Sequence, residues 1–174
     1  MDIILETPRL YLRRFTLSDE DAALVLHMNS QPEVLQYLHE PLLRDEAHAK
    51  EILATHILPQ YEQQLGRWAV HVKATNAFIG WCGLKQRPER DDEIDLGYRF
   101  EPAAWGKGYG AEAAAACLEY AFAKLKLEQV NACAHVENKG SLRILEKIGM
   151  QYTHDDVIDD CPVKCFVAVK GAKH

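Results

Sequence analysis

Residues 96–113, LGYRFEPAAWGKGYGAEA, contain the most informative pattern of the chain. Apolar residues alternate with polar or small ones up to Phe100, which predicts a β-strand. The Ala-rich end of the stretch has high helix propensity. Between them, Gly106, Gly108 and Gly110 leave three positions without a Cβ atom just before the helix. Successive backbone N–H groups at such a helix start can converge on an anion, and the stretch therefore predicts a strand, a diphosphate-binding loop and a helix.

Outward from this stretch, periodicity and turn residues divide the rest of the chain. Strands are predicted at 9–15, 68–72, 78–84, 94–100, 129–136, 150–154 and 163–169. Helices are predicted at 18–28, 45–64, 111–126 and 138–148. Ser18 and Asn138 are favoured N-cap residues, and Gly149 ends the last helix. This order predicts one α/β (α+β) domain spanning 1–174, with a mixed central sheet of about six to seven strands flanked by helices.

Composition excludes several classes of function. The 174 residues are 48% hydrophobic and 26% charged, as in globular proteins. The net charge of −6, without a Lys/Arg cluster, argues against a nucleic-acid partner. No uncharged stretch approaches the roughly 20 residues of a membrane helix, and the start lacks a signal-peptide pattern. We expect a cytoplasmic protein without a membrane partner, either a monomer or a homodimer.

Cysteine and histidine spacing gives no metal motif. The five cysteines include no CxxC pair, and the eight histidines form no HExxH pattern. Cys161 and Cys165 are close enough in sequence to approach one metal ion, but no complementary histidines can be assigned. The sequence therefore predicts free thiols and no metal.

The glycine loop also matches the dinucleotide fingerprint GxGxxG/A through Gly106, Gly108 and Ala111. Glu128 follows at about the expected spacing. The preceding strand, however, is half polar, whereas a dinucleotide-binding strand is buried and nearly continuously apolar. Few residues follow the motif, so a dinucleotide-binding oxidoreductase is the least favoured alternative. Negative charge gathers at 88–95 and 154–160, either as solvated loops or as a rim that attracts a cationic substrate.

Several motifs together resemble the GNAT superfamily of acetyl-CoA-dependent N-acetyltransferases. The sequence WGKGYG at 105–110 is similar to its [Q/R]xxGxG/A signature, with Trp105 a departure that is usual in the RimJ/RimL-like branch. The same branch is similar at TPRLYLR (7–13), DLGY (95–98) and NKGSLRILEKIG (138–149). The resemblance implies the GNAT fold, with a mostly antiparallel sheet and acetyl-CoA in the cleft beside the fourth strand.

The resemblance also implies the roles of individual residues. The residues expected to bind acetyl-CoA are Tyr98, Arg99, Phe100, Trp105, Gly106, Lys107, Gly108, Tyr109, Gly110, Ala111 and Asn138. Ser141 is the candidate that protonates the leaving CoA thiolate. Asp95, or Glu93 two residues earlier, is the candidate base, acting through water. Direct transfer in a ternary complex needs no covalent enzyme intermediate, so none is assigned.

The implied reaction is transfer of an acetyl group to a primary amine in a ternary complex. The branch suggests a protein N-terminal α-amine, as in ribosomal-protein acetyltransferases, or a small cationic amine. An acyl-CoA-binding sensor or partner module without catalysis is the alternative from another class.

Overall fold

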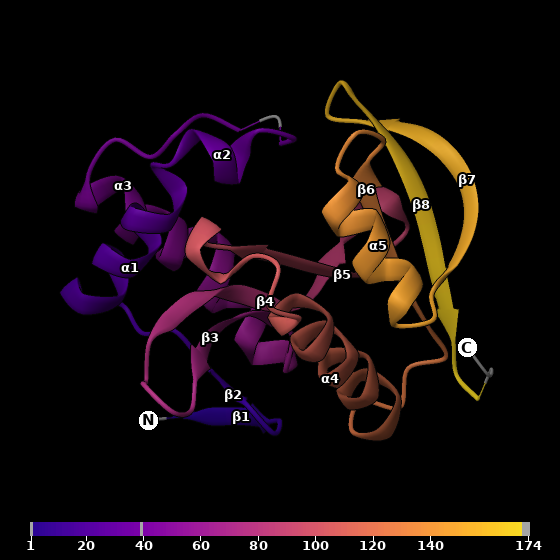
Figure 1. Ribbon diagram of the computed structural model, residues 1–174, viewed down its shortest axis with the longest axis horizontal. Coiled ribbons are helices and arrows are strands. Elements are labelled where there is room, and N and C mark those ends of the chain that lie inside the picture. The colour runs from indigo at the N-terminus through magenta and orange to yellow at the C-terminus, as the bar shows by residue number, and fades with distance from the viewer. Residues whose placement is uncertain (1, 39, 172–174) are drawn as a thin grey trace.

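The structure, a computed structural model, describes residues 2–38 and 40–171 of the chain. One eight-stranded sheet has the order β1-β2-β3-β4-β5-β6-β8-β7 (Figure 1). Neighbouring strands are antiparallel except β5 and β6, which run parallel. The strands are β1 (Ile3–Glu6), β2 (Leu10–Arg13), β3 (Gly66–Val72), β4 (Phe78–Arg87), β5 (Glu93–Phe100), β6 (Gln129–His135), β7 (Gln151–Ile158) and β8 (Cys161–Val169).

Five α-helices flank the sheet on both faces. They are α1 (Asp19–Asn29), α2 (Pro32–Leu35), α3 (Glu46–Ile52), α4 (Tyr109–Ala123) and α5 (Lys139–Lys147). Because parallel strands need a crossover connection, α4 joins β5 to β6. None of the described helices combines the length and the apolar character needed to cross a bilayer.

Side-chain alternation along the strands creates two cores. On β3, Trp68 and Val70 are buried in the larger core beneath α4 and α5. The intervening Ala69 belongs to a smaller core with α1 and α3, together with Phe15 and Trp81. Since successive strand residues point to opposite faces, these assignments give each face of the sheet its own layer of helices.

The first turn of α4 lies close to α5. A Cβ atom at Gly110 would lie 2.7 Å from Cδ1 of Ile144 on α5, so glycine permits this approach. Figure 1 shows the two helices together in front of the sheet. The N-caps Ser18 and Asn138 are both confirmed by their side-chain hydrogen bonds. Gly149 ends α5 with a φ of 89°.

The structure corrects three element predictions. The short strand β1 was missed, so the sheet has eight strands and the strand expected fourth is β5. The helix expected at 45–64 is α3, followed by a π-helical turn (Leu53–Ile57) and a 3-10 turn (Leu58–Gln63). The acidic segment 154–160 is not a loop: most of it lies in β7, and only Asp159 and Asp160 form the turn to β8.

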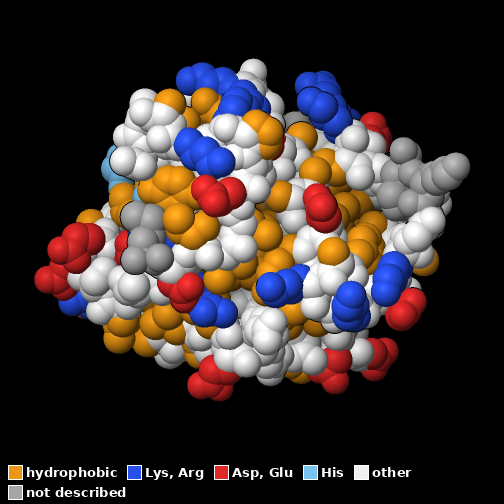
Figure 2. Space-filling model, turned by 90° about the horizontal axis from the view of Figure 1, so that it is seen from below, with side chains coloured by type: hydrophobic (Ala, Val, Ile, Leu, Met, Phe, Trp, Pro, Cys, Tyr) orange, Lys and Arg blue, Asp and Glu red, His pale blue; other side chains and the backbone are white. Residues whose placement is uncertain are grey.

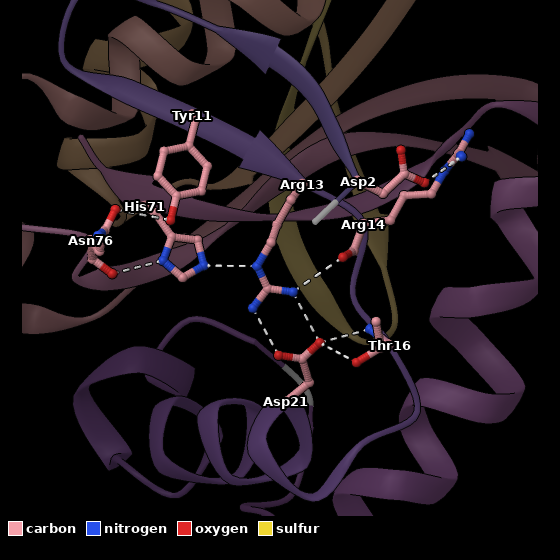
Figure 3. A pocket seen from close by; sticks show the side chains of 8 residues that line it. All are labelled: Asp2, Tyr11, Arg13, Arg14, Thr16, Asp21, His71 and Asn76. Atoms are coloured by element: carbon pink, nitrogen blue, oxygen red, sulfur yellow. Dashed lines mark hydrogen bonds and ion pairs between the residues drawn. The ribbon is translucent and has the colours of Figure 1, made fainter.

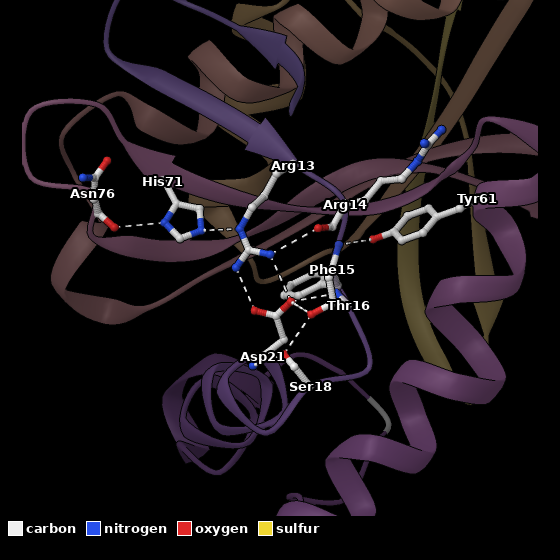
Figure 4. Close-up of polar contacts among 9 residues, drawn as sticks. All are labelled: Arg13, Arg14, Phe15, Thr16, Ser18, Asp21, Tyr61, His71 and Asn76. Atoms are coloured by element: carbon white, nitrogen blue, oxygen red, sulfur yellow. Dashed lines mark hydrogen bonds and ion pairs between the residues drawn. The ribbon is translucent and has the colours of Figure 1, made fainter. Parts of the chain in front are cut away.

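An open cavity of about 370 Å³ lies between β2, β3 and α1 (Figure 3). It is lined by Asp2, Tyr11, Arg13, Arg14, Thr16, Asp21, His71 and Asn76. None of these belongs to the predicted site. At its centre, two nitrogens of the Arg13 guanidinium donate to the two carboxylate oxygens of Asp21, at 2.8 and 3.0 Å (Figure 4). This buried pair fastens α1 to β2.

The tautomer of His71 follows from its neighbours. Arg13 Nε can only donate, so His71 Nε2, 3.1 Å away, accepts. His71 Nδ1 then donates to the carbonyl oxygen of Asn76 at 3.0 Å. The Tyr11 ring stacks on the imidazole. Burial lowers the pKa of His71, and the nearby Arg13 charge adds to this.

We predict that His71 makes the fold sensitive to mild acid. Because its folded-state pKa lies below the ordinary value of about 6.5, the unfolded chain binds the extra proton first. Stability is therefore complete above about pH 6.5 and falls as the pH drops below that value. Urea midpoints measured from pH 7.5 to 5 check this, with His71→Gln expected to flatten the profile. Burial tends to raise the pKa of Asp21, but hydrogen bonds from Arg13 and Thr16 outweigh it and lower the pKa. Protonation of Asp21 therefore affects stability only at a more acidic pH than protonation of His71. An equal acid loss in both proteins contradicts the prediction.

Candidate active site

The parallel strands β5 and β6 separate along their length. Asp95 pairs with Asn131, and no further register pair joins these two strands, all of whose residues are described. On its other side, β5 pairs with β4 continuously from Glu93 to Phe100. Beyond Asp95, β5 therefore presents to the gap an edge without a strand partner. Such an edge can pair with an extended ligand through backbone groups.

The loop after β5 contains a row of backbone donors without hydrogen-bond partners. The N–H groups of residues 106–111 have no hydrogen-bond acceptor among the described residues. The next one, on Glu112, donates to the Gly108 carbonyl at 3.1 Å and begins the helical pattern. Gly106 and Gly108 have φ of 76° and 82°, in the left-handed region that favours glycine. The six free donors stand at the positive end of α4, as an anion site requires.

Residues from the start of the chain hold this loop in place. Arg9 Nε donates to Glu112 at 2.7 Å, and Arg9 Nη1 donates to the Lys107 carbonyl at 2.9 Å. Thr7 donates to the same carboxylate at 2.6 Å. Burial opposes ionisation of Glu112, but these bonds outweigh it and hold its pKa below the ordinary value. The sequence signalled this contact only as the TPRLYLR motif, without assigning it a role.

Tyr98, Ser141 and Asn138 meet where β5 faces the start of α5. The Tyr98 hydroxyl lies 2.9 Å from Ser141 Oγ and 3.0 Å from the Ser141 carbonyl oxygen. Asn138 Oδ1 accepts from the Ser141 N–H at 3.1 Å, which is the capping geometry. Burial raises the pKa of Tyr98 well above its usual range, so its phenol remains protonated at neutral pH. Tyr98 is thus a hydrogen-bond partner of Ser141, a role that its strand position did not indicate.

The two candidate bases lie on the opposite face of β5. The β4–β5 register contains no bulge, so Glu93 and Asp95 share a face, as their spacing predicts. Asp95 is buried and ion-paired with Arg87, whereas Glu93 is half-buried and lies 3.4 Å from Arg90 Nε. Burial raises the pKa of Asp95 despite the opposing Arg87 charge.

The remaining predicted residues divide between the loop and the two faces. The Arg99 side chain points to the face opposite Tyr98, where it contacts Asn29 and Glu40. Trp105 Nε1 donates to the Phe100 carbonyl at 2.9 Å and leaves its ring half exposed. Lys107 is exposed, Tyr109 and Gly110 are half-buried, and Ala111 is buried in the first turn of α4.

Strand pairing brings together one group of side chains that could hold a cation. The ligand atoms of His154, Asp156 and Cys165 all lie within 4.8 Å of one another. Sequence spacing could not suggest this group, because it depends on β7 pairing with β8. Arg90 Nη1 lies 3.5 Å from Asp156, so a cation of the protein already faces this carboxylate. The absence of a metal stays a prediction.

Surface charge does not single out an acceptor on the face shown in Figure 2. Basic and acidic side chains are interspersed there with apolar ones. The acidic side chains on β7 also have local partners, since Asp155 faces Lys164 and Asp156 faces Arg90. The attraction of a cationic substrate by 154–160 stays a prediction.

Comparison with known proteins gives a consistent result. The model of the family "Acetyltransferase (GNAT) domain" matches residues 9–151. An uncharacterized N-acetyltransferase, p20, of Bacillus licheniformis is 31% identical over 147 residues, covering 84% of this chain and 82% of p20.

Two solved structures have the same fold at low identity. RimL, a ribosomal-protein α-N-acetyltransferase in complex with coenzyme A, superposes with a TM-score of 0.81 at 13% identity, covering 97% of this chain and 98% of RimL. Spermidine N-acetyltransferase of Vibrio cholerae, in complex with CoA and spermine, gives 0.77 at 18% identity, covering 94% and 97%. These two proteins differ in the acceptor that they are named for, so the shared fold does not choose one.

Proposed function

The chain belongs to the GNAT family of acetyltransferases and is an acetyl-CoA-dependent N-acetyltransferase; on this premise we propose that it acetylates an α-amine, of a protein N-terminus or of a small molecule, by direct attack in a ternary complex. One observation carries the proposal. Six unpartnered N–H groups at 106–111 lie at the end of β5, whose edge opens toward β6. An ordered diphosphate site beside a free strand edge suits a ligand that has a diphosphate and an amide-containing arm. We place the reaction in the cytoplasm, with the amine acceptor as its partner.

The residues present fit acetyl-CoA, which supplies an activated acyl thioester when bound. The loop N–H groups would bind its diphosphate, with Lys107 adding charge. Backbone groups from Tyr98 to Phe100 would bind the pantetheine arm. An N–H of the same strand would donate to the thioester carbonyl, where negative charge develops.

Ser141 is the candidate that gives a proton to the departing sulfur. Its Oγ is oriented by the Tyr98 hydroxyl at 2.9 Å, and its backbone N–H is held by Asn138. Because burial raises the pKa of Tyr98, the phenol stays protonated and acts as a neutral hydrogen-bond partner that positions the Ser141 hydroxyl. A thiolate leaving group has a pKa of roughly 8.5 by analogy with cysteine, so it needs only modest help.

The attacking amine must lose its proton first. At pH 7.4, an α-amine with a pKa of about 7.8 costs roughly 0.5 kcal/mol to deprotonate, whereas a lysine side chain at about 10.4 costs roughly 4. This difference favours an α-amine. Asp95, acting through water, is our candidate base, and Glu93 on the same face is the alternative.

Replacing Ser141 by alanine tests the acid role. We expect kcat to fall about tenfold while the KM for acetyl-CoA changes less than about threefold, since general acid catalysis acts only in the transition state. The assay follows CoA release from acetyl-CoA with an amine panel. Ser30→Ala, which removes a serine hydroxyl bonded to the His27 carbonyl at the end of α1, is the matched control.

An unchanged kcat in Ser141→Ala would exclude Ser141 as the acid. Transfer to any amine excludes a purely sensing role. Binding of acetyl-CoA without transfer to any amine would favour the sensor instead.

A further inference from the structure

A row of three residues crosses the middle of the sheet on the face of α1 and α3. Arg67 on β3 is the register partner of Gly83 on β4, and Gly83 is the partner of Gly97 on β5. Neither glycine has a side chain, so the Arg67 side chain can extend across both. Arg67 Nη1 donates to the Gly83 carbonyl at 3.2 Å. A Cβ atom at Gly97 would lie only 2.4 Å from Arg67 Nη2, so the guanidinium lies directly on β5.

The backbone of Arg67 is fixed from behind. The Tyr61 hydroxyl donates to the Arg67 carbonyl at 2.6 Å and accepts from the Phe15 N–H at 3.0 Å (Figure 4 shows the Tyr61–Phe15 contact). Because the Arg67 backbone is anchored in this way, the positions that its guanidinium can reach are restricted. The position over Gly97 is therefore built into the sheet.

The two neighbouring arginines have carboxylate partners, and Arg67 does not. Arg87 is paired with Asp95, and Arg99 with Glu40. Within the described ranges, no carboxylate forms an ion pair with Arg67, and the Gly83 carbonyl is its side chain's one hydrogen-bond acceptor. A guanidinium has five N–H donors, so most of them are free for a ligand.

The charges on this face of the sheet also favour a negatively charged ligand. Burial lowers the pKa of Arg67 to about 10; repulsion from Arg87 contributes, and attraction to the Asp95 carboxylate opposes the shift without cancelling it. The pKa of Lys85 is also lowered, by burial and then by Arg67 and Arg87. A negative group placed here would relieve the repulsion, whereas a second ammonium group would add to it.

We propose that Arg67 binds the carboxylate of the acceptor, and that the acceptor is a small α-amino acid. This rests on the proposed function, because Gly97 adjoins Tyr98 on the edge where the acetyl group would lie. In an α-amino acid the amine and the carboxylate share one carbon. A carboxylate bound at Gly97 thus holds the amine beside that edge. Carboxylates match the planar donor pair of arginine, which binds both oxygens at once.

The diphosphate of acetyl-CoA does not compete for this role. Its proposed donors, residues 106–111, follow the end of β5, whereas Gly97 lies in the middle of the strand. A protein N-terminus has a peptide carbonyl in place of the carboxylate. A polyamine would place its second ammonium group among Arg67, Lys85 and Arg87.

Matched acceptors test the inference. Acetyl transfer is measured for the twenty L-amino acids, for their amides and for putrescine. We expect at least one amino acid to exceed its own amide by about tenfold or more in kcat/KM, as a charged hydrogen bond predicts. Arg67→Met should remove that difference, lowering kcat/KM for the acid about tenfold and for the amide less than about threefold. Arg67→Lys, which keeps the charge without the donor fork, should be intermediate.

Two controls separate binding from folding. Because Arg67 has no ion pair to lose, Arg67→Met should melt at or above the wild-type temperature. Arg14→Met, which removes an arginine paired with exposed Asp2, should leave the acid preference unchanged. Amides or putrescine acetylated as well as the amino acids would overturn the inference and leave the transferase in place. Equal losses on acid and amide in Arg67→Met, or acetyl-CoA binding without acetylation of any amino acid, would also overturn it. A folded protein that does not bind acetyl-CoA would overturn the proposed function itself.

Discussion

Replacing Gly108 by valine is expected to raise the dissociation constant for acetyl-CoA by about 100-fold or more. Gly108 has a φ of 82°, which a β-branched residue adopts only at considerable cost. Its new Cβ atom would also lie 3.2 Å from Arg9 Nη2, the guanidinium that holds the Lys107 carbonyl. Both effects move the six N–H donors at 106–111 out of alignment. Isothermal titration with acetyl-CoA measures the change.

The chain offers a matched control for backbone strain. Gly171 has a φ of 79°, and a Cβ atom there would have no described neighbour within 4 Å, but this glycine lies after β8, outside the loop. Gly171→Val therefore introduces similar strain without touching the donors, and acetyl-CoA affinity should stay within about threefold of wild type. Equal affinity in the two variants would show that the loop geometry does not determine binding.

Replacing Asp21 by alanine is expected to lower the free energy of unfolding by about 3–5 kcal/mol, because it leaves Arg13 buried without its partner. Asp21 also accepts from the Thr16 N–H at 2.7 Å and from its hydroxyl at 2.9 Å, so the variant loses the connection that orients α1. Urea denaturation at pH 7.5 gives the difference.

The exposed ion pair between Arg14 and Asp2 serves as a control for the buried pair between Arg13 and Asp21. Arg14 and Asp2 are 2.8 Å apart, but the Asp2 side chain is 60% exposed, whereas that of Asp21 is 5% exposed. Asp2→Ala should therefore cost about 1 kcal/mol or less. Similar losses in the two variants would mean that burial does not set the strength of these pairs.

Local signals in the sequence predicted much of this architecture. The strand at β5, the glycines Gly106 and Gly108 before α4 and the caps Ser18 and Asn138 depend on residues near one another in the chain, and each was confirmed. The third glycine, Gly110, lies inside α4, which begins at Tyr109. Local propensity failed at β1, which has only four residues, and in the segment 45–64, where the α-helix passes into π-helical and 3-10 turns.

The contacts that distinguish the site join distant segments. Tyr98 meets Ser141 across 43 residues, and Arg9 meets Glu112 across 103. Arg67 reaches Gly97 only because two strand registers align them. Periodicity gives the face of a strand but not the register of its neighbour. The sequence could therefore name Ser141 and Asp95 without showing that Ser141 packs against one face of β5 while Asp95 points to the other.

The anion-binding loop and the free edge of β5 are the two features on which the proposed function rests. Isothermal titration of the purified protein with acetyl-CoA, with NAD as the comparison ligand, tests both at once. We predict binding at one site per chain for acetyl-CoA and none for NAD at the same concentrations. A folded protein that does not bind acetyl-CoA, or that binds NAD instead, would contradict the proposed function.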